Sequence, residues 1–81
     1  MTERELLAIL MKEVAVGQAF GHYHSPHEAY GVIKEELDEF FEEVRRKHDQ
    51  RDEEALFKEA IQVAATALRY AWELKEGLIG S

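Results

Sequence analysis

Carboxylate side chains gather in the middle of this chain, within the segment KEELDEFFEEVRR at residues 34–46. Glu35, Glu36 and Glu39 occupy about one and a half turns of the helix that this segment predicts. Like charges three or four residues apart on one helix repel each other by roughly 0.2–0.5 kcal/mol per pair. A stripe this dense is therefore expected to face either open solvent or a cation.

Helical periodicity predicts three helices separated by two short breaks, over residues 3–20, 26–47 and 53–76. The start of the second helix is the best-defined boundary, because Ser25 at the N-cap precedes Pro26 at the first helical position and Glu28 at the capping-box position. Gly21 and Gly77 are expected to end the first and third helices. No segment alternates apolar and polar residues as a strand does, so we expect an all-α helical bundle in a single domain over residues 1–81.

The carboxylates of the second helix can be placed relative to its apolar arc by taking about 100° per residue. The arc is centred between Ile33, Leu37 and Val44. Glu36 lies roughly 80° from that centre. Glu36 is therefore expected to be partly buried, and the other two carboxylates are expected to lie further round the helix.

The third helix has an apolar surface wider than the roughly 100° arc of an ordinary surface helix. We therefore expect it to be central and packed on two sides, and its alanines would let a second subunit approach closely and complete a bundle. Its less apolar flank carries a polar line of side chains, namely Glu59, Gln62, Thr66, Arg69 and Glu73. This polar line is placed to face the carboxylates of the second helix.

The spacing of the acidic residues resembles the signature of a known family. EELDE at residues 35–39 is followed, after nineteen residues, by EAIQ at residues 59–62. This arrangement is similar to the EExxE…ExxD motif of the MazG-like all-α nucleotide pyrophosphohydrolases, and the resemblance extends over residues 25–72. It implies a helical bundle that assembles as a homodimer or homotetramer. It also implies cleavage of a nucleoside triphosphate between the α and β phosphates, giving a monophosphate and pyrophosphate in nucleotide-pool housekeeping.

The resemblance also implies roles for individual residues. Glu36, Glu39 and Glu59 would be ligands of Mg²⁺, with Mn²⁺ as a possible substitute, and Glu35 would be a further ligand or the base that activates water. Magnesium prefers oxygen ligands and is usually held by a few carboxylates together with substrate phosphates, so these residues suit it. The family's final aspartate is Gln62 here, a neutral fourth ligand whose missing charge is expected to weaken metal affinity.

Four side chains are candidates for binding the substrate. Arg69 lies two turns after Gln62 on the polar line, which makes it the leading cation for phosphate oxygens, ahead of Lys34. His24 and His27 lie at the start of the second helix, where free N–H groups and the helix dipole favour anions. For Lys34 and the two histidines, an ordinary exposed side chain is the competing interpretation.

Composition limits the classes of function. With 81 residues the chain is one domain near the lower size at which a core folds alone, which favours a partner subunit. A net charge of −7 argues against direct contact with nucleic acid, because phosphate backbones are bound by clustered Lys and Arg. The sequence has no cysteine, no secretory signal pattern at its start and no apolar run long enough for a membrane span. We therefore expect a cytoplasmic protein that does not bind membranes.

Two alternatives belong to other functional classes. The chain could be a MazG-like metal- and nucleotide-binding module that has lost turnover, in which case magnesium with a triphosphate would still stabilise it. It could also be a helical protein-interaction protein whose glutamates form a solubilising surface. Replacing Glu36 and Glu39 together with Gln would then be neutral or slightly stabilising.

Overall fold

Residues 1–79 form three α-helices and one short 3₁₀ helix. The computed structural model describes residues 1–79, and Gly80 and Ser81 of the expected domain lie outside the described residues. The elements are α1 (Glu3–Gln18), α2 (Pro26–Val44), η1 (His48–Gln50) and α3 (Glu53–Lys75). No strand occurs within residues 1–79, so the predicted all-α class is confirmed.

Each α-helix begins at a side chain that satisfies its free backbone N–H groups. Thr2 and Glu5 form a reciprocal capping box with two hydrogen bonds of 3.1 Å. The Ser25 hydroxyl accepts a hydrogen bond from the backbone three residues later, and the Asp52 carboxylate accepts one from the backbone two residues later. Such caps contribute typically about 1 kcal/mol each, so local sequence fixes where the three helices start.

The helices end slightly earlier than the periodicity predicts. α1 ends at Gln18 and α2 at Val44, two and three residues before the expected ends at 20 and 47. The end of α2 is held by Arg51, whose Nε donates to the carbonyl oxygen of Val44 at 3.1 Å and so satisfies one of the terminal carbonyls. Gly21 and Gly77 follow their helices with positive φ of 104° and 71°, conformations that glycine adopts without a Cβ clash.

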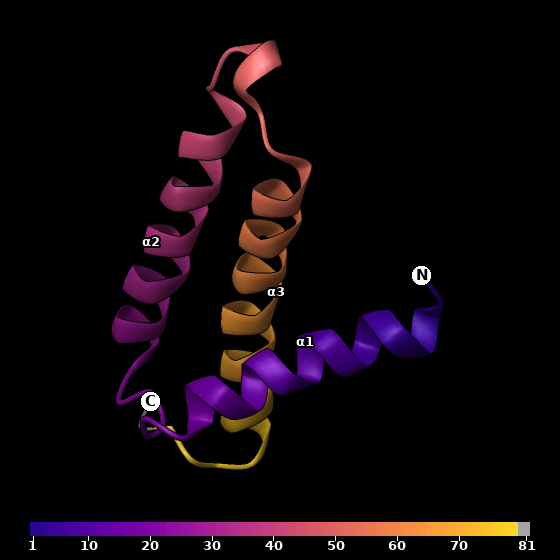
Figure 1. Cartoon of the computed structure of the whole chain (residues 1–81). Helices are drawn as coiled ribbons and strands as arrows, with labels where there is room; N and C mark the ends of the chain where they lie inside the picture. Colours follow the sequence, from indigo (N-terminus) through magenta and orange to yellow (C-terminus); the bar gives the residue numbers. More distant parts are fainter. Residues whose placement is uncertain (80–81) are drawn as a thin grey trace.

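The central element of the fold is α3. α2 and α3 run antiparallel and side by side, whereas α1 crosses α3 at a steep angle and its N-terminal half points away from both (Figure 1). α1 and α2 each pack against α3 but not against each other within residues 1–79. The expectation that the third helix is the central one is therefore confirmed.

The polar line is the most buried side of α3. Thr66 and Glu73 are 8% and 0% exposed, while Phe57, Leu68 and Trp72 of the apolar arc are exposed. The expectation that the polar line faces the second helix is consistent with this burial, whereas the apolar surface, expected to be packed on two sides, is partly exposed. The reason is that within residues 1–79 α3 contacts two helices, α1 and α2, and both lie along its polar line.

The buried side of α2 is also rotated from the expected position. Glu36 is half-buried, as expected, but Leu37 is 50% exposed, so its predicted place at the centre of the buried arc is wrong. Ala29, which is fully buried, and the half-buried Val32 and Phe40 lie on the same side as Glu36. Glu36 thus lies in the middle of the contact with α3 rather than on its shoulder.

Large apolar side chains remain uncovered on this chain. The buried cluster is small and is formed by Tyr23, Ala29 and Ile79 with Val32 and Tyr70 packed against it. The exposed apolar residues of α2 and α3 are Tyr30, Leu37, Phe41, Phe57, Leu68, Trp72 and Leu74. In the described part of the chain, no helix combines the length and apolar character needed to cross a membrane.

Replacing Ser25 with Ala should lower the free energy of unfolding by about 1 kcal/mol, because the hydrogen bond that caps α2 is lost. Urea unfolding followed by far-UV circular dichroism measures this difference. Ser25→Asp is the matched control and should retain most of the wild-type stability, since its carboxylate also caps. Equal stability of the alanine variant and the wild type would show that the cap does not stabilise α2.

Candidate metal centre

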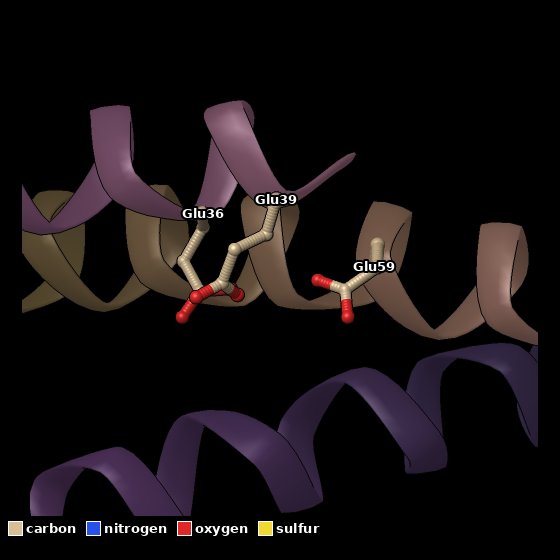
Figure 2. A group of neighbouring side chains, drawn as sticks. All are labelled: Glu36, Glu39 and Glu59. Atoms are coloured by element: carbon tan, nitrogen blue, oxygen red, sulfur yellow. The ribbon is translucent and has the colours of Figure 1, made fainter. Parts of the chain in front are cut away.

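Three carboxylates from two helices converge at one place. Glu36 and Glu39 lie one turn apart on α2, and Glu59 comes from the neighbouring α3; one oxygen of each lies within 4.8 Å of the others. Figure 2 shows the three side chains directed into the same space, on the side of α2 and α3 that faces α1. The antiparallel packing of α2 and α3 thus brings Glu59 beside residues that lie 20 and 23 positions earlier in the sequence.

Within residues 1–79, no cationic side chain forms an ion pair with the cluster of three carboxylates. Oε2 of Glu59 is buried and accepts no hydrogen bond. None of the ion pairs within residues 1–79 includes Glu36, Glu39 or Glu59. A buried carboxylate oxygen without a partner is costly, so the group is destabilising by itself and suits a bound cation.

The pKa of Glu36 reflects this environment. Burial raises the pKa of Glu36 to about 7, and repulsion from Glu39, Glu59 and Glu35 adds to the effect. Glu35 is itself exposed and lies outside the group of three. Near neutral pH, Glu36 therefore carries a proton for part of the time.

The donor set fits a hard divalent cation. All three groups offer carboxylate oxygens, with no histidine or cysteine among them. Oxygen-only sites suit magnesium, calcium and manganese, whereas imidazole and thiolate ligands are typical of zinc. The residues present are therefore compatible with Mg²⁺ or Mn²⁺, with a few positions left for substrate oxygens or water.

Gln62, the residue at the fourth position of the motif, contacts a carboxylate that the sequence analysis missed. Its Nε2 donates to Oε2 of Glu13 on α1 at 2.8 Å. Glu13 lies four residues after Ile9 and three after Leu10, so its place on the inner face of α1 was the available signal. The crossing of α1 over α3 brings this extra negative charge beside the polar line.

A cavity of about 220 Å³ lies between Glu36 of the candidate metal centre and Arg69. It lies between the three helices, and its polar lining includes Glu13, Glu36, Gln62, Thr66 and Arg69. A carboxylate of the candidate metal centre and the leading phosphate-binding candidate therefore border the same space. Gln62 and Thr66 of the polar line form the side of the cavity that runs from Glu36 to Arg69.

Arg69 is fixed in place by two neighbours. Its guanidinium carbon lies 3.9 Å from the centre of the Tyr23 ring, and its Nε lies 3.3 Å from Oε2 of Glu73. This contact is an ion pair whose geometry is not that of a hydrogen bond. Glu73 also accepts a hydrogen bond of 2.9 Å from the backbone N–H of Tyr23. Burial raises the pKa of the Tyr23 phenol, whose hydroxyl donates to the carbonyl oxygen of Thr66 at 3.2 Å.

The remaining substrate-binding candidates lie apart from this cavity. Lys34 is exposed and pairs with Asp38 at 3.1 Å. His24 is also exposed and contacts Glu28 at 2.9 Å, and His27 borders an open hollow at the start of α2. The structure brings none of these three into the lining of the cavity beside Arg69.

Comparisons of the chain with protein-family models, with curated proteins and with solved structures found no match. The described residues form a three-helix fold in which α2 and α3 bring three carboxylates together, with a cavity that extends from one of them, Glu36, to the largely buried Arg69. Any statement of its function therefore rests on these residues.

Replacing Glu36 with Gln should stabilise the metal-free protein at pH 8 by about 0.5–1 kcal/mol, because it removes repulsion among like charges. The pKa of Glu36 is raised in the folded state from 4.5 to about 7. Ionising this residue therefore costs stability, and the cost grows as pH rises between these values. At pH 5 the folded protein holds the proton, so the benefit of the substitution should largely disappear.

Urea unfolding in EDTA at pH 5 and pH 8 measures this dependence. Glu35→Gln is the matched control, since it removes the same charge from the exposed neighbour. A stability gain for Glu36→Gln that is identical at both pH values, or equal to that of the control, would contradict the assigned environment.

Proposed function

We propose that this protein is a magnesium-dependent nucleoside triphosphate pyrophosphohydrolase of the MazG-like type. The supporting observation is that Glu36, Glu39 and Glu59, which match the family's acidic signature, lie within 4.8 Å of one another. Glu59 also contributes a buried oxygen that has no hydrogen-bond partner. The proposed reaction converts a ribo- or deoxyribonucleoside triphosphate and water into a monophosphate and pyrophosphate.

The acidic group allows an acidic protein to bind an anionic substrate. A divalent cation held by Glu36, Glu39 and Glu59 would neutralise charge on the phosphate oxygens and position them. Gln62 donates its Nε2 to Glu13, which leaves its carbonyl oxygen as a neutral acceptor at the fourth position. The side chain of Arg69 supplies positive charge at the far end of the same cavity.

The chemical step needs a proton acceptor near the attacking water. The oxygen of water bonds to the α-phosphorus, the bond to the oxygen bridging to the β-phosphate breaks, and pyrophosphate leaves with that electron pair. Glu35, which is exposed, is the sequence-based candidate for accepting the water's proton, with a role as a further metal ligand as the alternative. Glu13, which lines the cavity, is a second candidate for this role.

We also propose that the chain assembles as a homodimer or as a dimer of dimers, in the cytoplasm where nucleotide pools are maintained. Leu37 and Phe41 of α2 and Leu68 and Trp72 of α3 are exposed in the single chain. Exposed apolar surface of this kind favours association. In a symmetric oligomer, a second copy of the same chain would cover the exposed apolar residues of both helices.

Replacing Glu39 with Gln should reduce magnesium-dependent pyrophosphate release by about a hundredfold or more, because a charged ligand is lost. A coupled assay with a panel of ribo- and deoxyribonucleoside triphosphates measures the release. Glu42→Gln, an exposed position on the same helix, is the matched control and should keep wild-type activity. Full activity in Glu39→Gln would rule out the assigned ligand set.

Gln62 favours a second candidate, a binding module without turnover, since the family's aspartate is missing. Replacing Gln62 with Asp should lower the stability of the metal-free protein, because the hydrogen bond to Glu13 is replaced by repulsion. The same change should increase the stabilisation that Mg²⁺ gives in a thermal melt. Turnover that appears only in this variant would identify a site that binds but does not hydrolyse. If neither protein responds to magnesium with a triphosphate, the chain is a helical interaction protein.

A further inference from the structure

Arg69 lies near the C-terminal end of α3, and its side chain extends to Gly17 of α1. Its Nε edge faces Glu73, which is completely buried and is also 3.4 Å from Nδ1 of His22. One face of the guanidinium lies on the Tyr23 ring. The side chain is only 14% exposed, so its position is determined by the protein rather than by solvent.

Gly17 on α1 supplies the space that the end of this side chain occupies. A Cβ atom at Gly17 would lie 2.5 Å from Nη1 and 3.2 Å from Cδ of Arg69. Contacts below 3.0 Å cannot persist, so any larger residue would displace the guanidinium. The φ of Gly17 is not positive, which means that the missing side chain, and not an unusual backbone, is what this position requires.

The cavity limits what can bind between Arg69 and the acidic residues. Its volume of about 220 Å³ is below the roughly 300 Å³ at which pockets begin to hold a drug-sized ligand. It therefore has room for part of a nucleotide. A ligand that reaches from a cation at Glu36 to the guanidinium must carry negative charge at both ends, and guanidinium groups bind phosphate oxygens well because they offer paired donors.

We propose that the Arg69 end of this cavity binds a diphosphate group, the part of the substrate that leaves as pyrophosphate, and that Gly17, Tyr23 and Glu73 are positioning residues that hold the guanidinium there. The identity of the ligand rests on the proposed function. The base and sugar then lie outside this cavity. Arg69 selects for the length of the phosphate chain rather than for the base.

Calorimetric titration with inorganic pyrophosphate in the presence of Mg²⁺ tests the proposal. Arg69→Gln should weaken pyrophosphate binding by about ten- to a hundredfold, as expected for loss of charge-assisted hydrogen bonds. Orthophosphate should bind the wild type more weakly than pyrophosphate. Arg45→Gln, which removes the same charge from an exposed site at the end of α2, is the matched control and should bind as the wild type does.

Gly17→Ala separates a positioning role from a structural one. Alanine is a better helix former than glycine, so α1 should keep its helical far-UV circular dichroism, although moving the guanidinium away from the buried Glu73 should lower thermal stability. Pyrophosphate affinity should also fall by about tenfold, because the guanidinium has moved. A Gly17→Ala variant that binds pyrophosphate as the wild type does would remove Gly17 from the positioning set.

Titration with Mn²⁺ alone distinguishes failure of this proposal from failure of the proposed function. Arg69→Gln should bind Mn²⁺ as the wild type does, whereas Glu39→Gln should bind it weakly. An absence of triphosphate hydrolysis would refute the proposed function and leave a pyrophosphate site that depends on Arg69. The diphosphate proposal is overturned if the wild type does not bind pyrophosphate, if Arg69→Gln binds it equally well, or if Arg45→Gln loses as much.

Discussion

The burial of a polar line in the centre of a very small fold is the constraint on which the other features depend. α3 lies between α1 and α2, and both neighbours contact the side that carries Glu59, Gln62, Thr66, Arg69 and Glu73. Buried polar groups need partners, and each member solves this differently. Arg69 and Glu73 pair with each other and with Tyr23, whereas Gln62 pairs with Glu13. Glu59 keeps one buried oxygen without a hydrogen bond.

This arrangement places the acidic cluster and the arginine at different positions along a single helix. Glu59, at the start of the polar line, lies beside Glu36 and Glu39. Arg69, two turns beyond Gln62, lies against the Tyr23 ring and is paired with Glu73. The cavity between the three helices joins the two ends. A metal cation would neutralise the carboxylates at one end of the cavity. A phosphate chain could then bind both that cation and the arginine at the other end. Because both neighbours lie along the polar line, the large apolar residues Phe57, Leu68, Trp72 and Leu74 of α3 remain exposed in the single chain.

Local sequence predicts much of this molecule, and the parts that it misses have a common cause. Caps such as Ser25, the central role of α3 and the half-burial of Glu36 follow from short-range chemistry and helical periodicity. Local sequence does not predict the contacts of Glu13 and Tyr23 or the exposure of Leu37. These features depend on the angle at which α1 crosses α3 and on which face of each helix has a neighbour. Amphipathic patterns report which residues favour burial, not which ones a single chain is able to cover.

The thinness of the molecule determines how its carboxylates respond to solution conditions. The shortest extent of the chain is 17 Å, so no part of α3 is separated from solvent by more than one layer of neighbouring structure. At physiological ionic strength, charges are screened over about 8 Å, a length comparable with half of that extent. Dissolved ions can therefore approach closely enough to weaken the repulsion among Glu36, Glu39 and Glu59. Added salt that does not bind specifically should therefore relieve this repulsion, while it weakens exposed ion pairs such as Lys34–Asp38.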